Sequence, residues 1–459
     1  MNPAIGMIIL AQNFRLRLYR WYALLGAALL LAVPLTDNSS WPGLAHAQDE
    51  QEQQETTKVS GISERVYRKF AEAQELMEAD DYLGAVEVLD ELKAKRKLSS
   101  TETIQLYRIY GVIYFNQERY KDAIRAFESL LEQEDVNERD RNDTLFTLAQ
   151  LHFQIEDWKG AIKILKDWLA AVENPPSQPF IMLGSAYYQI DQYKNVIAPV
   201  ERAIEIARQR DKEVKERWWL LLRAAYYEIN NIPKVTEILE ILVVNWPKKE
   251  YWTMLSGMYG ELDREQRQLG AYESAYDQGL LIKSAEIVTL AQLLMQAEAG
   301  YKAARIIDKG FSDGIVEENE TNYRLLSQAW QMAAEYEKAI EPLKQAAKIS
   351  DEGELDVRLA NSYLNLDRYE DCIAASRSGL KKGGLKRTAI AQELLGMCLF
   401  ETDKFEDSKK AFKQAAKDKK IKKRARNWIK FIESEQARIA HINDAIKQAR
   451  LARDLARNR

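Results

Sequence analysis

Apolar residues recur along most of the chain at the three- and four-residue steps of an amphipathic helix. Ala123, Phe127 and Leu130, for example, occupy positions i, i+4 and i+7, which fall on one face of a helix. Short polar stretches such as 116–119 and 156–157 separate these periodic segments. Prolines and glycines are sparse for a β-rich fold, with 10 and 20 in 459 residues. The pattern therefore predicts an all-α protein of helices joined by short turns.

A fixed set of offsets repeats along this pattern. After a small residue, an aromatic follows at +3 and another at +9, a small or apolar residue at +12 and a large apolar residue at +16, as in Gly111, Tyr114, Tyr120, Ala123 and Phe127. Similar sets start at positions 184 and 327. These residues resemble the tetratricopeptide repeat. The resemblance implies an α-solenoid, a right-handed superhelix of helix-turn-helix units with a C-terminal capping helix.

The small position recurs in about ten units. It is occupied by Ala73, Gly111, Ala149, Gly184, Arg223, Ser256, Ala291, Ser327, Ala360 and Gly396, which lie 33 to 39 residues apart. We therefore expect the units to cover residues 62–430. The pattern weakens where Arg223 replaces the small residue, where Gln268 occupies the second small position, and around 299–308.

The last segment, residues 431–459, is predicted to be a basic helix. From residue 404 to residue 459 there are 18 Lys and Arg against 7 Asp and Glu, a net charge of +11. Phosphate or an acidic partner would suit this end, but the solvated face of a terminal helix is the favoured interpretation. A stripe at helical spacing is expected to cover the last unit, and consists of Trp428, Ile432, Ile439, Ile442, Ile446 and Ala449. The whole chain has a formal net charge of −4, so nucleic acid is not an expected partner.

The N-terminus has the three parts of a secretion signal in order. Arg15, Arg17 and Arg20 precede an apolar run over 21–35, and a small-x-small site follows at 45–47. We predict a signal peptide over 1–47, cleaved after Ala47, then a flexible acidic tail over 48–61 and a periplasmic location. The apolar run is short for a membrane span, although an uncleaved anchor remains the alternative.

Residues that carry chemistry are scarce. The three histidines, His46, His152 and His441, form no metal-binding motif, and no paired C-x-x-C occurs. The sequence therefore predicts no enzymatic activity, no metal and no cofactor. Cys372 occupies a position filled elsewhere by Ala, which favours a buried small residue; a disulfide with Cys398 is the alternative, because their separation cannot be judged from sequence.

A row of aromatic residues is the candidate partner site. The residue after the +3 marker is aromatic in four successive units, and these residues are Phe115, Phe153, Tyr188 and Tyr227. In the tetratricopeptide family this position tends to face the inner groove, which implies a strip that holds an extended or helical peptide. The alternative is that the rings pack between neighbouring first helices. A second candidate is the Trp-rich set of Trp218, Trp219, Trp246 and Trp252, although the marker position of Trp219 favours the core.

In whole-chain character the sequence resembles the periplasmic tetratricopeptide proteins that accompany TonB–ExbB–ExbD systems in Gram-negative bacteria. The shared features are a cleavable signal, an acidic Gln-rich start, about ten degenerate units and a basic C-terminal helix. The resemblance implies a non-catalytic scaffold, with TonB, ExbB or ExbD as partners, that supports energised uptake of iron complexes. The alternatives are a scaffold for polysaccharide export or pilus assembly, and a glycan-binding accessory module.

Overall fold

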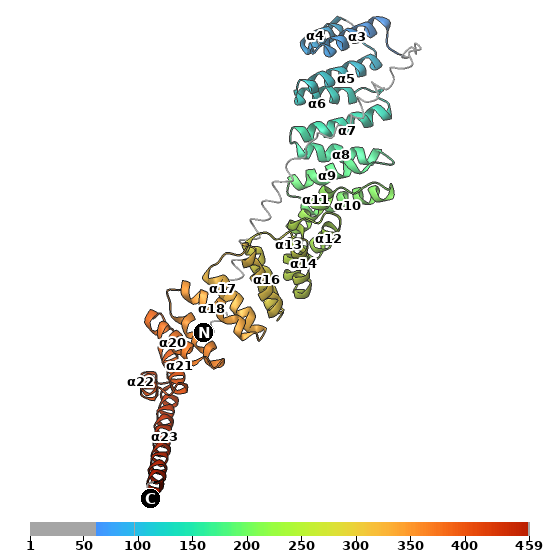
Figure 1. Ribbon diagram of the computed structural model, residues 1–459. Coiled ribbons are helices and arrows are strands. Elements are labelled where there is room, and N and C mark those ends of the chain that lie inside the picture. Colours follow the sequence, from blue (N-terminus) through green and yellow to red (C-terminus); the bar gives the residue numbers. More distant parts are fainter. Residues whose placement is uncertain (1–60, 96, 458–459) are drawn as a thin grey trace. The chain divides into compact units, whose positions relative to one another are not determined.

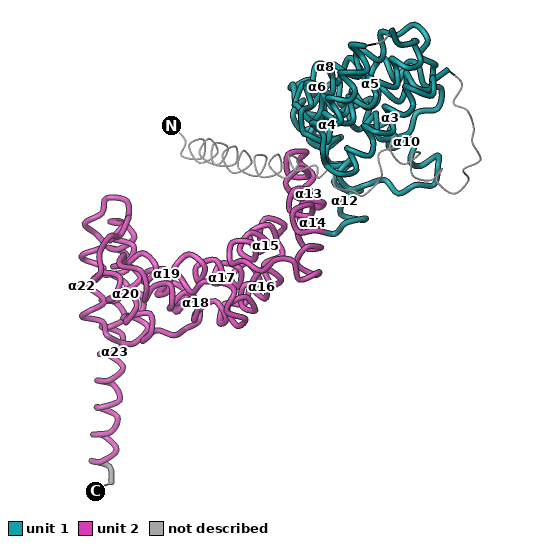
Figure 2. The backbone as a smooth tube through the Cα atoms, turned by 90° about the horizontal axis from the view of Figure 1, so that it is seen from above, with its two compact units in different colours: residues 1–247 teal, residues 248–459 magenta. Residues whose placement is uncertain are grey.

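The computed structural model describes residues 61–95 and 97–457. These residues form twenty-one α-helices and no strand, as the hydrophobic pattern predicted. The chain divides into two compact units, residues 1–247 and 248–459, which are coloured separately in Figure 2. The predicted signal peptide (1–47) and all but the last residue of the predicted tail (48–61) lie outside the described residues.

The described residues of the first unit form ten helices. They are α3 (Glu64–Glu78), α4 (Tyr82–Lys95), α5 (Ser100–Asn116), α6 (Tyr120–Leu131), α7 (Glu138–Gln154), α8 (Trp158–Ala171), α9 (Ser177–Gln189), α10 (Tyr193–Gln209), α11 (Glu216–Glu228) and α12 (Ile232–Asn245). Figure 1 shows them as successive antiparallel pairs, in which each odd-numbered helix packs on the even-numbered helix that follows.

The second unit contains eleven helices. They are α13 (Lys249–Glu261), α14 (Glu265–Asp277), α15 (Ser284–Gln296), α16 (Gly300–Ser312), α17 (Glu320–Met332), α18 (Tyr336–Ile349), α19 (Glu354–Asn365), α20 (Tyr369–Lys382), α21 (Thr388–Glu401), α22 (Phe405–Ala415) and α23 (Lys422–Arg457). Pairs form even where the sequence pattern is weak. At one such place the Ser256 hydroxyl donates to the Gln268 carbonyl at 2.8 Å, which joins α13 to α14.

Close approach of the two helices in a pair follows from the small residue and its +16 partner. A Cβ added at Gly111 would stand 2.5 Å from the Phe127 ring, and one at Gly396 would stand 2.8 Å from Phe412. The hydrogen atom of glycine therefore leaves the space that the aromatic ring fills. The small and large positions of the repeat therefore touch in these two pairs.

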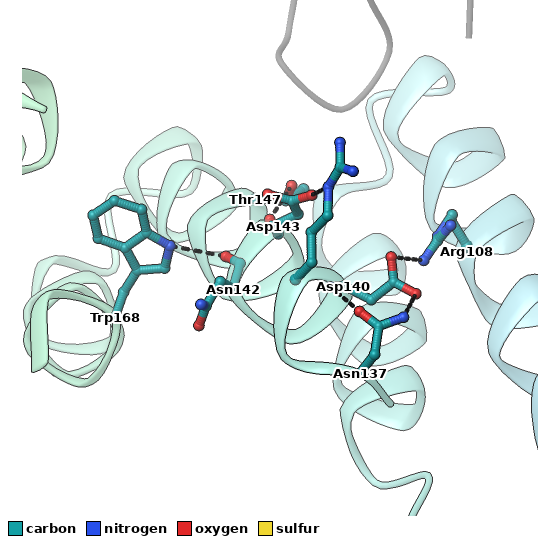
Figure 3. A network of polar contacts seen from close by, with 8 residues as sticks. Arg108, Asn137, Asp140, Asn142, Asp143, Thr147 and Trp168 are labelled. Carbon is teal, nitrogen blue, oxygen red and sulfur yellow. Dashed lines mark hydrogen bonds and ion pairs between the residues drawn. The ribbon is translucent and has the colours of Figure 1, made fainter. Parts of the chain in front are cut away.

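Polar contacts surround the start of α7 (Figure 3). Asn137 caps α7 by accepting from the Asp140 backbone N–H at 2.8 Å. The Asp140 carboxylate also pairs with Arg108 of α5 at 2.9 Å. Within the α7/α8 pair, Trp168 of α8 donates its ring N–H to the Asn142 carbonyl at 2.8 Å. The Arg108–Asp140 ion pair therefore links the α5/α6 pair to the α7/α8 pair.

The turn within each of the ten pairs α3/α4 to α21/α22 has the same backbone. The second residue after the odd-numbered helix has a positive φ, and these residues are Asp80, Glu118, Glu156, Asp191, Asn230, Asp263, Glu298, Ala334, Asp367 and Asp403. Around Ala334, its own N–H donates to the Gln331 carbonyl and the Glu335 N–H donates to the Trp330 carbonyl, which is a Schellman cap. Glycine usually takes this left-handed place, since a Cβ is strained there.

Replacing Ala334 by Gly is therefore expected to stabilise the protein by about 0.5–1 kcal/mol, because it removes the strain of an alanine at φ 57°. The measurement is the midpoint of urea unfolding. The matched control is Ala333→Gly one residue earlier, where φ is −77° and glycine should only destabilise. A shift of both variants in the same direction would contradict this account of the turn.

The two cysteines form a disulfide between α20 and α21, so the favoured interpretation of Cys372 was wrong about its bonding. Cys372 and Cys398 are both fully buried, with their Cα atoms 6.2 Å apart. The repeat pattern placed both residues on helices of neighbouring pairs, and it correctly predicted that Cys372 is buried. It could not give the distance between them, because that distance depends on how one pair packs on the next.

The last helix is longer than a cap requires. It begins at Lys422, inside the segment assigned to the last unit, and its 36 residues extend for about 54 Å at 1.5 Å per residue. Ile432 is fully buried and Trp428 stacks on Phe412 with ring centroids 5.3 Å apart, but Ile442 and Ile446 are 40% and 46% exposed. The predicted stripe therefore covers the last pair only along the first half of α23. The helices of the pairs have 11 to 17 residues and are too short to cover the second half.

Candidate protein-binding surface

The four predicted aromatic residues occupy one equivalent place in the first unit. Each is the penultimate residue of an odd-numbered helix, in four consecutive pairs: Phe115 of α5, Phe153 of α7, Tyr188 of α9 and Tyr227 of α11. All four are half-buried. We call them the aromatic strip. The helices thus place a partly exposed ring at the same turn of four successive pairs.

Three of these rings pack on the first residue of the following helix. The centroid distances are 5.9 Å for Phe115–Tyr120, 5.2 Å for Phe153–Trp158 and 5.2 Å for Tyr188–Tyr193. The fourth, Tyr227, has Ile232 at the corresponding place in α12. These ring contacts lie within a pair, across its turn. Phe115 and Phe153 also pack against core clusters that include residues of the next odd-numbered helix. One side of each ring is held rigid while part of it stays open to solvent.

The strip carries neutral hydroxyl groups among charged residues. Burial, and then the negative charge of Glu228, raises the pKa of Tyr188, although Arg223 nearby lowers it. The Tyr193 hydroxyl donates to the Asp191 carboxylate at 2.5 Å, and this hydrogen bond raises the pKa of Tyr193. Both tyrosines therefore stay protonated near neutral pH. They can bind a partner through ring faces and hydroxyl groups.

Arg223 lies at one of the places where the repeat pattern is weak. It occupies the small position of its unit and is nevertheless buried, on α11. Its effect on the pKa of Tyr188 shows that its charge lies near the strip. Sequence reasoning treated this arginine only as a defect of the pattern. The sequence signal that could have pointed to a role for Arg223 is its positive charge, at a position where the tetratricopeptide family has a small residue.

The strip is confined to the first unit. The penultimate residues of the odd-numbered helices in the second unit are Gly260, Met295, Gln331, Leu364 and Phe400. Only the last is aromatic, and it packs on Phe405 at 5.7 Å in the same way. An exposed row of rings is therefore a property of four consecutive pairs in the first unit.

The second unit contains an open cleft that sequence reasoning missed. It has a volume of about 590 Å³ and is lined by Asp308, Phe311, Glu318, Tyr323, Leu326, Trp330, Lys338, Glu341, Pro342 and Gln345 from α16, α17, α18 and the α16–α17 connection. Phe311 and Tyr323 stack at 4.8 Å. Lys338 stands 4.9 Å above the centre of the Trp330 ring. Trp330 itself is buried.

The Trp-rich set does not form one surface. Trp218 and Trp219 are buried in α11, as the marker position of Trp219 predicted. Trp246 and Trp252 are half-buried, and Trp252 packs against the core of the second unit. These residues mainly stabilise the fold.

Comparison with known proteins gives the fold a family context. A family model described as anaphase-promoting complex, cyclosome, subunit 3 matches residues 116–203. These residues include the α6–α9 helices and two residues of the strip. No curated protein matches the sequence.

Several solved structures are similar at low sequence identity. MamA from Desulfovibrio magneticus RS-1 is 18% identical, with 38% of this chain and 94% of that chain covered and a TM-score of 0.31. The TPR2AB domain of yeast Sti1, in a complex with pHSP90, is 14% identical, with 57% and 98% covered and a TM-score of 0.33. A tetratricopeptide repeat protein from Parabacteroides merdae is 16% identical, with 63% and 94% covered and a TM-score of 0.32.

The helix pairs, their repeated turn and the small-to-large contacts of each pair decide the class. The fold is a tetratricopeptide-type α-solenoid. Tetratricopeptide repeats are typically non-catalytic modules that bind other proteins. This repeat architecture therefore indicates a protein-interaction scaffold.

Other kinds of site find little support in the part of the chain that the structure describes. No three His, Cys, Asp or Glu residues there are grouped to hold a metal ion. His152 Nδ1 lies 2.8 Å from the Asp157 carboxylate, which also caps α8 by accepting from the Gly160 N–H. That histidine thus belongs to a turn of the tetratricopeptide scaffold. Among the described helices, none is both long and apolar enough to cross a bilayer.

Proposed function

We propose that this protein is a non-catalytic periplasmic scaffold that holds protein components of a TonB–ExbB–ExbD energy-transduction system. The observation that carries the binding role is the aromatic strip, a partly exposed ring at the same place in four consecutive pairs. Aromatic residues fixed by neighbours are well suited to bind protein partners, because little side-chain freedom is lost on binding. The periplasmic location and cleavage after Ala47 rest on the signal-like N-terminus.

The strip is proposed to hold an extended or helical peptide of the partner. Phe115, Phe153, Tyr188 and Tyr227 would contact its apolar side chains, and the hydroxyl groups of the two tyrosines would bind its backbone or polar groups. The TonB assignment itself rests on whole-chain resemblance: the acidic Gln-rich start, the repeats and the basic C-terminal helix.

Crosslinking in the cell tests the proposed partners. The tagged protein is crosslinked in its native host and the attached proteins are identified by mass spectrometry. Recovery of TonB, ExbB or ExbD supports the proposal, whereas recovery of export or pilus components instead would replace that system with another envelope assembly. Sequencing the N-terminus of periplasmic protein checks the location, because Gln48 is the expected first residue.

Substituting two strip residues should weaken binding of the crosslinked partner. We expect the Phe115→Ala, Tyr188→Ala variant to bind about 30-fold more weakly, since buried aromatic contacts at interfaces are worth about 2 kcal/mol or more. The measurement is isothermal titration with the purified partner, after circular dichroism has shown unchanged helix content.

Phe400→Ala is the matched control for this substitution. Phe400 occupies the same penultimate place in α21 and makes the same kind of ring contact, but it lies outside the strip. Its loss should leave partner affinity within about twofold of the original, as expected for a residue outside the contact surface. Unchanged affinity in the double variant would refute the strip as the binding site and leave the scaffold role to another surface.

A further inference from the structure

The start of the last helix presents an open cleft of about 550 Å³ with a basic lining. The lining consists of five cations, one amide and one aliphatic residue, namely Lys419, Lys422, Lys423, Arg426, Asn427, Ile429 and Lys430. No carboxylate is among these lining residues. We call this the basic cleft.

Four of the five cleft cations share one face of a firmly anchored helix. Steps of three or four residues lead from Lys422 through Arg426 to Lys430, which places them on the same side of α23, and Lys419 lies in the turn before this helix. The opposite side is buried: Ala425 and Ile432 are fully inaccessible, and Trp428 stacks on Phe412. The buried side of α23 therefore fixes the orientation of the helix backbone. The side chains of the cleft cations are themselves exposed.

The five cations have no carboxylate partner among the described residues. Nearby cations pair with carboxylates in Arg424–Glu393, Lys409–Glu406, Lys410–Asp407 and Arg438–Glu435. No residue in the described ranges forms an ion pair with a cation of the cleft. Mutual repulsion of five like charges is unfavourable, and a bound anion would relieve it.

We infer that the basic cleft is a second binding surface, which takes a short acidic segment of a partner protein. From Lys422 to Lys430 the helix rises about 12 Å, a distance that an extended peptide covers in about four residues. Several carboxylates within such a segment would each meet a cation. Ile429 adds an apolar contact, which suits a side chain such as leucine between the acidic residues. The site is separate from the aromatic strip, because the two belong to different units of the chain.

Other polyanions fit the surroundings less well. The exposed Ile442 and Ile446 lie on the same side of α23 as Ile432. A bilayer that bound this apolar side would therefore lie on the side of the helix opposite to the cleft cations. A nucleic acid binds through phosphate contacts spread over a longer surface than this cleft of five cations offers. A short acidic segment avoids both conflicts.

The test is fluorescence anisotropy of the purified protein with a labelled peptide of glutamates and one central leucine. We expect saturable binding that weakens as salt is added, and about tenfold weaker binding by the Lys422→Gln, Arg426→Gln variant. The matched control is Arg450→Gln, Arg453→Gln, which removes two exposed charges from the same helix outside the cleft and should change affinity less than twofold. All four residues are exposed, so both variants should keep the fold, which circular dichroism checks.

Three further probes decide between ligand classes, namely inorganic phosphate, a short DNA duplex and phosphatidylglycerol vesicles. The inference predicts that each competes poorly with the peptide, and that the same peptide with glutamine in place of glutamate does not bind. Tighter binding of DNA or vesicles, full competition by phosphate, or an equal loss in the two charge variants would overturn it.

Discussion

Reduction of the Cys372–Cys398 disulfide is expected to lower the free energy of unfolding of the second unit by about 3.5 kcal/mol. The bond closes a loop with a sequence separation of 26 residues, and the chain-entropy estimate for a loop of this length gives that value. Both cysteines are fully buried in one core cluster with residues of α18, α19 and α22, so the bond also fixes α20 against α21. The measurement is urea unfolding followed by circular dichroism, with and without reductant.

The Cys372→Ala, Cys398→Ala variant is the control for the reductant itself. It should unfold at lower urea than the oxidised protein, and adding reductant should not shift its midpoint. Thiol titration of the denatured, unreduced protein should detect no free thiol. Two titratable thiols, or a midpoint of the original protein that reductant does not move, would show that the bond does not form. Stable formation would also agree with the proposed periplasmic location, because disulfides persist in oxidising compartments.

Gly184→Ala is expected to destabilise the first unit by about 1–3 kcal/mol, the usual cost of overpacking a core. Its new Cβ would stand 2.6 Å from Cγ2 of Val200 and 3.4 Å from the Val196 carbonyl oxygen. Val200 is fully buried and branched at Cβ, so its methyl group cannot move aside easily. This steric cost exceeds the gain of about 1 kcal/mol that alanine brings to a helix interior.

Gly270→Ala separates the steric effect from helix propensity. Gly270 lies inside α14 with no atom within 4 Å of its virtual Cβ, so alanine should stabilise there by about 0.5–1 kcal/mol. The Gly184→Ala, Val200→Ala double variant should lose less than the sum of its two single variants, since the second change removes the clash. Similar shifts of the two glycine variants, in the same direction, would contradict close packing at the small position.

Much of the repeat was predictable because its contacts are local. The offsets +12 and +16 join residues of one helix pair, and helical geometry with a short turn nearly fixes such distances. The pairs Gly111–Phe127 and Gly184–Val200 are examples of such local contacts. The aromatic strip was partly predictable for the same reason. Its residues lie at equivalent positions, but their packing partners, such as Tyr120 and Trp158, were not foreseen.

The sequence by itself determined the all-α class and the helix pairs. Only the tertiary structure decided the Cys372–Cys398 bond, the cleft beside Trp330 and the exposed second half of α23. The physical reason is the range of the interactions. Within a pair, a turn of a few residues leaves the two helices little freedom. Between pairs, the relative rotation results from many weak contacts summed over large surfaces, and no short pattern of residues encodes that sum.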